Sequence, residues 1–235
     1  MKAIFKKEMK SYFASPLGYV FIAVFLLVSA LFFFVNNLVY GLGDISYVFS
    51  NIILLLVLLI PVLTMRSFAE EKNKKTDQLL LTSPIKVSSI VLGKLFAALA
   101  VFGIALVLTV IYPLILSIYT KMSWGMILCN YIGFFLMGAS FISIGIFISS
   151  LTENLLISAF GSFAALFVVY LMDWVSMSVS NTIISAIVNA ISITARFNDF
   201  AIGIINIEYV IYFISIVAVF VILTVAQIEK RRWVK

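Results

Sequence analysis

The chain has 235 residues, of which 64% are hydrophobic and 11% are charged. Soluble domains average about half apolar and about a quarter charged residues, so this composition excludes an ordinary soluble protein and indicates an integral membrane protein. The net charge of +6 is compatible with nucleic-acid binding, but in a membrane protein basic residues are better explained by topology. No histidine is present and Cys129 is the single cysteine, so the chain cannot form an internal disulfide and lacks the usual transition-metal ligands. We therefore expect no metal and no cofactor in this chain.

The first predicted element is an amphipathic helix over residues 1–15. Lys2, Lys6 and Lys10 recur every four residues on one face, with an apolar stripe beside them. This pattern is typical of a helix that lies in the plane of the lipid headgroups. The residues expected to anchor it at this interface are Phe5, Met9, Tyr12 and Phe13. The alternative is that the lysines serve only as a topology signal for the first span.

Six stretches are then long and apolar enough to cross a bilayer, which takes about 20 helical residues. Runs such as "LLLVLLIPVL" do not alternate as membrane β-strands do, so the expected class is all-α. The predicted spans are 17–39, 46–65, 90–118, 124–149, 155–172 and 208–228. This arrangement puts all 16 basic residues except Lys121 and Arg196 on one side, which is the cytoplasmic side by the positive-inside rule. Both termini are therefore expected in the cytoplasm.

The interval 174–195 is long enough to span but is rich in Ser, Thr and Asn. A seventh span here would also move the basic C-terminal cluster to the outer side, against the positive-inside rule. We therefore expect 173–207 to form extracytoplasmic helices between spans five and six. Pro61 and Pro113 are expected to kink spans two and three.

Residues 66–89, "RSFAEEKNKKTDQLLLTSPIKVSS", form a charged segment between spans two and three. A short amphipathic helix is predicted over 68–83, because Pro84 would end it. The simpler interpretation is a solvated loop whose lysines enforce topology. Glu70, Glu71 and Asp77 favour a specific protein contact instead, because acidic residues add little to topology.

Three stretches of the chain resemble the membrane subunits of type-2 ABC exporters, in particular the gliding-motility-type and multidrug-type permeases. They are "KKEMKSYFASPLGYVFIAVFLL" at the N-terminus, "MRSFAEEKNKKTDQLLLTSPI" over 65–85 and "LGKL" over 92–95. Two departures stand out. Lys75 occupies a position where that family usually has Gly, and Asp77 and Gln78 occupy positions where it has Leu and Glu.

The resemblance implies that 1–235 is one transmembrane domain and that 66–89 is a cytoplasmic coupling segment. The coupling segment would dock on a separate ABC ATPase subunit, and that partner would bind ATP and Mg. The residues expected at this contact are Arg66, Glu70, Glu71, Lys72, Thr76, Asp77, Gln78, Leu79, Leu80, Leu81 and Pro84. A possible second contact consists of Thr152, Glu153 and Asn154, which would otherwise form a plain turn that caps span five.

The resemblance also implies two ATPase copies, a second copy of this permease or a related one, and a bacterial plasma membrane with its lipids as surroundings. Small residues recur four apart in spans four and five, at Gly145 and Ser149 for example, and such spacing permits close packing within one chain or between two. A homodimer is the family's expected assembly.

The expected function is the permease of an ATP-driven exporter for a hydrophobic or amphipathic cargo such as a peptide, lipid or drug. Gly93-Lys94 is followed by Leu95 and does not form a phosphate-binding loop, so we expect no ATP hydrolysis in this chain. The alternatives are an ATP-independent secondary transporter or channel, for which no buried charge or inverted repeat is evident, and a membrane enzyme, for which no nucleophile elbow is evident.

Overall fold

The structure is a computed structural model that describes residues 1–76, 85–120, 123–178 and 192–233. Every regular element in these ranges is a helix, which confirms the predicted all-α class. In chain order the elements are α1 Lys2–Ala14, α2 Pro16–Phe33, the π-helix η1 Phe34–Val39, α3 Ser46–Thr64, α4 Ala69–Asn73, α6 Val87–Leu108, α7 Ile111–Tyr119, α8 Trp124–Leu151, α9 Leu155–Ser178, α11 Ile193–Ala201 and α12 Ile207–Trp233.

Within the described ranges, six helical stretches are long and apolar enough to cross a membrane, as predicted. They are Pro16–Val39, Ser46–Asn73, Val87–Tyr119, Trp124–Leu151, Leu155–Met172 and Ile207–Arg231. The second stretch includes both α3 and the charged turn and helix α4 that follow it. Its apolar part is α3, which ends at Thr64.

The third span is interrupted between α6 and α7, around Thr109 and Val110. Pro113 lies in the first turn of α7 and has no N–H group with which to bond the Thr109 carbonyl, so a continuous α-helix cannot be maintained there. The predicted disturbance at Pro113 is confirmed. Pro61 is accommodated inside α3, which continues to Thr64.

The bundle is built around α8, the most buried of the spans, whereas α9 and α12 are the least buried. Phenylalanine rings from three spans meet beside α8: Phe25 of α2, Phe102 of α6 and Phe134 of α8 have ring centroids 6.0 to 6.4 Å apart. Gly138 permits this approach, because a Cβ atom there would lie 2.3 Å from Cε1 of Phe102. This part of the core is thus a close contact between the backbone of α8 and an aromatic ring of α6.

A second close approach joins α8 to the end of α3. A Cβ atom at Gly145 would lie 2.3 Å from Oγ1 of Thr64. Ser149, one turn further along α8, hydrogen-bonds the residues that follow α3. The small-residue spacing of Gly145 and Ser149 therefore serves packing within the chain.

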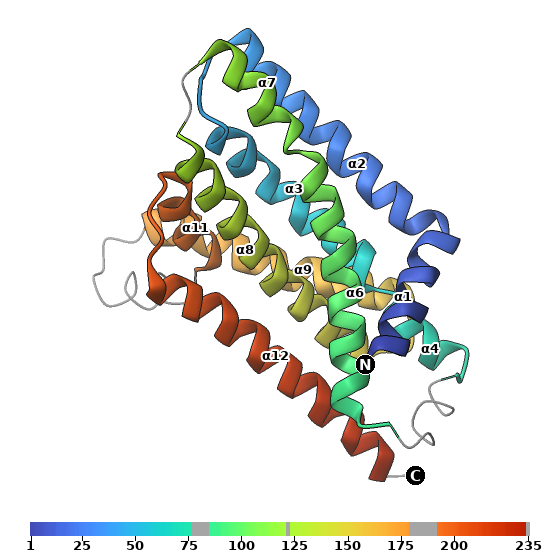
Figure 1. Ribbon diagram of the computed structural model, residues 1–235. Coiled ribbons are helices and arrows are strands. Elements are labelled where there is room, and N and C mark those ends of the chain that lie inside the picture. Colours follow the sequence, from blue (N-terminus) through green and yellow to red (C-terminus); the bar gives the residue numbers. More distant parts are fainter. Residues whose placement is uncertain (77–84, 121–122, 179–191, 234–235) are drawn as a thin grey trace.

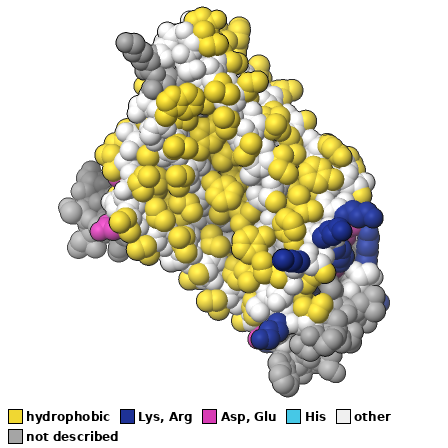
Figure 2. Space-filling view, in the orientation of Figure 1, with side chains coloured by type: hydrophobic (Ala, Val, Ile, Leu, Met, Phe, Trp, Pro, Cys, Tyr) yellow, Lys and Arg dark blue, Asp and Glu magenta, His cyan; other side chains and the backbone are white. Residues whose placement is uncertain are grey.

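The two ends of the bundle differ in character (Figure 1). α1, α4 and both chain termini lie at one end, and basic side chains gather at this end of the otherwise apolar surface (Figure 2). At the other end α11, from the predicted outer segment, packs on α8 through Phe197 and Phe200, and a Cβ atom at Gly133 would lie 2.5 Å from Phe200. α11 is therefore docked into the bundle.

Candidate functional site

The chain leaves α3 through a turn and then forms the five-residue helix α4. Arg66 in the turn donates two hydrogen bonds to the Glu70 carboxylate, from Nε at 2.5 Å and from Nη2 at 3.0 Å. Lys74 donates a third to Oε1 of Glu70 at 2.7 Å. Both pairs are four residues apart, and Glu70 and Glu71 lie in the first turn of α4, where the helix dipole favours acidic side chains. These contacts stabilise a helix that is too short to form alone.

The neighbouring glutamate joins a cluster of charges from three separate helices. Glu71 of α4 accepts a hydrogen bond from Nζ of Lys7 in α1 at 2.8 Å, and its other oxygen lies 2.9 Å from Nζ of Lys94 in α6. Lys94 also donates to Glu8 of α1 at 2.9 Å. We call Lys7, Glu8, Glu71 and Lys94 the charge cluster. It connects α1, α4 and α6 in space.

Lys94 is the centre of the charge cluster and is only 2% exposed. Besides the two carboxylates, it donates to the carbonyl of Ser67 at 2.6 Å and lies 4.9 Å from the ring centroid of Phe68. A buried ammonium group is costly unless it is paired, and these contacts satisfy that requirement. Two lysines balance two glutamates in the charge cluster.

Lys7 sits at the solvent side of the charge cluster, with more than half of its side chain exposed. Desolvation by burial lowers the pKa of this amine, but the hydrogen bond and the Coulomb attraction of Glu71, with a further contribution from Glu8, outweigh it, so the pKa is raised from the ordinary lysine value. Lys7 therefore stays protonated and keeps its pairing at neutral pH.

α1 approaches α6 closely at Gly93, the residue before Lys94 of the charge cluster. A Cβ atom at Gly93 would lie 2.9 Å from Cγ2 of Ile4, so only glycine fits there without displacing α1. Gly93 thus brings the two helices together and Lys94 joins them by charge. Lys2, Lys6 and Lys10 lie on the exposed face of α1.

The four predicted interfacial residues of α1 fall into two groups. Phe5, Met9 and Phe13 are partly buried and pack against the core. Tyr12 is 7% exposed, and its hydroxyl donates to the carbonyl of Leu63 at 3.2 Å. Tyr12 therefore packs inside the protein. The spacing of apolar residues in the sequence could not reveal this, because it does not distinguish an apolar residue that faces lipid from one that faces the protein.

The inner face of α4 is held against the end of α8. The hydroxyl of Ser149 accepts hydrogen bonds from the backbone N–H groups of Phe68 at 3.1 Å and Ala69 at 3.2 Å, and donates to the carbonyl of Met65 at 3.0 Å. Lys72 is buried and its ammonium group donates to the carbonyl of Ser150. Ser149 thus satisfies N–H groups at the start of α4 that a helix leaves unpaired.

The outer face of the segment is exposed at Lys74, Lys75 and Thr76. Lys75 has a φ of 56°, in the left-handed region that glycine adopts without strain. Lys75 occupies the position where the family that this chain resembles usually has Gly. The backbone conformation that glycine adopts easily is therefore adopted here by a lysine. The other expected contact residues, Asp77, Gln78, Leu79, Leu80, Leu81 and Pro84, lie outside the described residues.

The predicted second contact is the turn between α8 and α9. Asn154 accepts hydrogen bonds from the N–H groups of Leu156 at 2.9 Å and Ile157 at 3.4 Å, and its own N–H donates to Thr152 at 3.1 Å. Asn154 is therefore the expected cap of span five. Glu153 is 62% exposed and pairs with Arg231 of α12 at 3.0 Å.

The sequence did not identify Glu8, Ser149 or Lys94 as members of a charged or hydrogen-bonded site. Lys94 was considered as a basic residue that sets topology and as part of Gly93-Lys94, which does not form a phosphate-binding loop, and it belongs to the "LGKL" stretch. The "LGKL" stretch held a signal that could have identified Lys94 as part of a site, because a lysine beside a glycine inside an apolar helix requires both a close neighbour and a counter-charge. The small-residue spacing marked Ser149 as a packing position, but the hydrogen bonds of Ser149 and of Glu8 have no sequence signal, because their partners are distant in the chain.

A comparison with protein-family models matches residues 2–226 to the family described as "ABC-2 family transporter protein". A comparison with curated proteins found no match. Permeases of the matched family are membrane components of transport and not themselves catalytic, and they generally work with an ABC ATPase. The match covers nearly the whole chain and agrees with its six apolar spans. The chain therefore belongs to the ABC-2 transporter family, as a multi-pass membrane permease.

Proposed function

We propose that this chain is the permease of an ATP-driven exporter and that residues 66–89 dock on a separate ATPase subunit. The proposal rests on the difference between the two sides of the described part of this segment: one side is bonded to other helices and the other side is exposed. Its inner side is bonded to α1, α6 and α8, through the charge cluster and Ser149. Its outer side exposes Lys74, Lys75 and Thr76. A partner that binds the outer side would act on three helices at once.

The contacts also suggest how motion would pass into the membrane. α4 follows α3 directly, and Glu71 of α4 is paired with Lys94 near the start of α6. A displacement of α4 would therefore pull on spans two and three together. ATP and Mg would be bound by the partner, and two ATPase copies would drive two permease subunits between inward-open and outward-open arrangements.

The proposed cargo is hydrophobic or amphipathic, such as a peptide, lipid or drug, moved out of the cell. The intervals 95–120 and 122–152 within the spans contain no charged residue, which favours such cargo over small ions. We further propose a bacterial plasma membrane with both termini in the cytoplasm. The gathering of both termini, α4 and many basic side chains at one end supports this orientation (Figures 1 and 2).

The test is to purify the tagged chain gently from its native membrane and identify bound soluble subunits by mass spectrometry. Lys75→Glu reverses a charge on the exposed side, and Lys10→Glu is the matched control because it reverses an exposed lysine of α1. We expect an ABC ATPase to co-purify, to be lost with Lys75→Glu and to be kept with Lys10→Glu. Glu71→Lys is unsuitable for this purpose because it would also break the charge cluster.

Two outcomes would contradict the proposal. If no ATPase co-purifies under any mild condition, the ATP-driven mechanism loses its support. If an ATPase binds equally to both lysine variants and to wild type, the partner docks elsewhere, and the turn at Glu153 becomes the next surface to test.

A further inference from the structure

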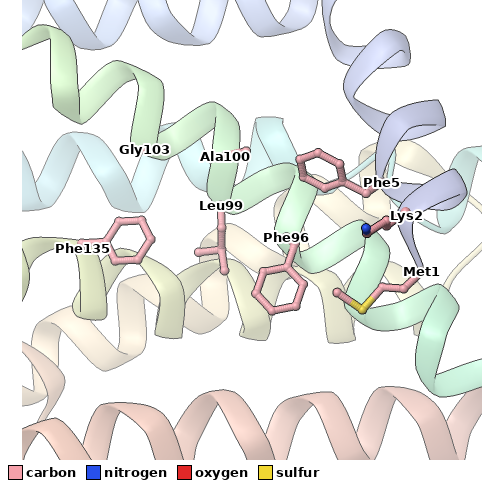
Figure 3. A pocket seen from close by; sticks show the side chains of 8 residues that line it. All are labelled: Met1, Lys2, Phe5, Phe96, Leu99, Ala100, Gly103 and Phe135. Atoms are coloured by element: carbon pink, nitrogen blue, oxygen red, sulfur yellow. The ribbon is translucent and has the colours of Figure 1, made fainter.

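A second feature of the charged end is an apolar cavity of about 570 Å³ between α1, α6 and α8. This volume is within the range of about 300 to 1,000 Å³ that is usual for small-molecule sites. Figure 3 shows the side chains of α1 at one end, Phe135 of α8 at the other and those of α6 between them. The lining residues are Met1, Lys2, Phe5, Phe96, Leu99, Ala100, Gly103 and Phe135.

The cavity is elongated along α6. Phe96, Leu99, Ala100 and Gly103 share one face of this helix, and the rise from Phe96 to Gly103 is about 10 Å along its axis. Among the described residues that line the cavity, Lys2 carries the charged side chain, and it lies at the end nearer the start of α6, where α1 crosses Gly93. The lining of the cavity is therefore almost wholly apolar, and a lysine lies at one end of it.

The missing side chain of Gly103 is not needed to let two helices pack closely. A Cβ atom there would meet only Phe135 at 3.7 Å, an ordinary contact distance. At Gly93, Gly138 and Gly145, by contrast, a Cβ atom would lie within 3.0 Å of a neighbouring helix. Gly103 leaves the cavity open, whereas the other three let helices touch.

The charges at this end indicate the sign of the occupant. Lys7 and Lys94 are neutralised by Glu8 and Glu71 in the charge cluster. Lys2, Lys6 and Lys10 lie exposed on α1, and no acidic partner is found for them among the described residues. A second copy of this chain would bring further positive charge, since the net charge is +6. An anionic group fits this face better.

We propose that the cavity binds an anionic phospholipid from the leaflet at the charged end, with one acyl chain along α6 and the headgroup phosphate at Lys2. The apolar interior would take up the chain by hydrophobic transfer, and Lys2 would favour a negative headgroup. This site is separate from the proposed ATPase contact and does not depend on it.

Native mass spectrometry of the purified full chain tests the proposal, with phosphatidylglycerol or phosphatidylcholine of identical acyl chains added. Wild type should retain phosphatidylglycerol about fivefold better than phosphatidylcholine. Lys2→Gln should abolish this preference, and Lys10→Gln should keep it. Equal retention of both lipids by wild type, or an unchanged preference in Lys2→Gln, would overturn the headgroup assignment.

Gly103→Leu tests the acyl-chain site, because leucine would fill the cavity. Retention of both lipids should fall at least about tenfold. Gly125→Leu is the matched control, since Gly125 is exposed on α8 and its Cβ position is open. Ala100→Leu fills the same cavity from the previous turn of α6 and replaces Gly103→Leu if that variant melts below wild type. Wild-type lipid retention in a correctly folded filling variant would overturn the proposal.

A final experiment tests whether the cavity is covered by lipid or by a second copy of the chain. Phe96→Cys is made in a Cys129→Ser background and oxidised in the native membrane. We expect no cross-linked dimer, because lipid occupies the cavity. Efficient cross-linking through position 96 would show that another copy covers this face, and would overturn the lipid assignment.

Discussion

The ammonium group of Lys94 lies 2.9 Å from the carboxylate of Glu71, so the third span is ion-paired to the segment that follows the second span. Lys94 is 2% exposed and belongs to α6, whereas Glu71 belongs to α4. Glu8 of α1 shares the same ammonium group at 2.9 Å. The segment proposed to bind an ATPase is therefore an integral part of the permease structure.

Lys94→Met should destabilise the purified chain strongly. It removes the cation between Glu8 and Glu71 and leaves two partly buried carboxylates with Lys7 as their remaining ion-pair partner in the charge cluster. Breaking a buried ion pair on one side typically costs about 3 to 5 kcal/mol. A thermal unfolding measurement in detergent should show a clearly lower midpoint.

The control for this substitution is Lys86→Met, which removes an exposed lysine just before α6. Its midpoint should stay close to wild type. Adding Glu71→Gln to Lys94→Met should cost less than the sum of the two single effects, because the residues interact directly. Additive effects would show that the pair contributes no coupling.

Ser149→Ala should loosen α4 from α8. The hydroxyl bonds two backbone N–H groups and one carbonyl in residues 65–69, and its loss leaves buried groups unsatisfied. The expected cost is about 1 to 3 kcal/mol. Hydrogen exchange of the amides of Phe68 and Ala69 should become faster. Ser215→Ala is the control, since that exposed hydroxyl donates to the Tyr212 carbonyl within α12; equal acceleration at residues 68 and 69 in both variants would contradict the assignment.

Lys75→Gly should be tolerated and should stabilise the turn after α4. Lysine at a φ of 56° is in a conformation that costs about 1 kcal/mol for residues other than glycine. Lys74→Gly is the opposite control, because Lys74 has a φ of −81° and gains nothing from glycine. Limited proteolysis of the segment should become slower with the first variant and faster with the second. The same response from both would indicate that the turn adopts another conformation.

Gly145→Ala should destabilise the contact between α8 and α3. The added Cβ would lie 2.3 Å from Oγ1 of Thr64, and overpacking of this kind typically costs about 1 to 3 kcal/mol. Gly103→Ala adds the same atom at an ordinary distance of 3.7 Å and should leave the unfolding midpoint unchanged. Adding Thr64→Ala should partly rescue Gly145→Ala, because it removes the clashing oxygen. An equal effect of both glycine substitutions would contradict the packing described here.

The sequence by itself determined the class of protein and the course of its chain through the membrane. Six helices follow from the length and apolarity of the spans, because a bilayer requires about 20 apolar residues in a form that satisfies its own backbone. The charged segment at 66–89 and the break near Pro113 are local features, set by the residues that compose them. Such properties need no knowledge of neighbouring helices.

Only the tertiary structure decided which charges and hydroxyls meet. Glu70 and Glu71 are adjacent and chemically alike, yet Glu70 pairs locally with Arg66 and Glu71 pairs with lysines of α1 and α6. Likewise Tyr12 is buried although it belongs to an apolar stripe expected to face lipid. The physical reason is that these contacts depend on how closely helices cross, and at α1 and α6 that distance depends on the missing side chain of Gly93.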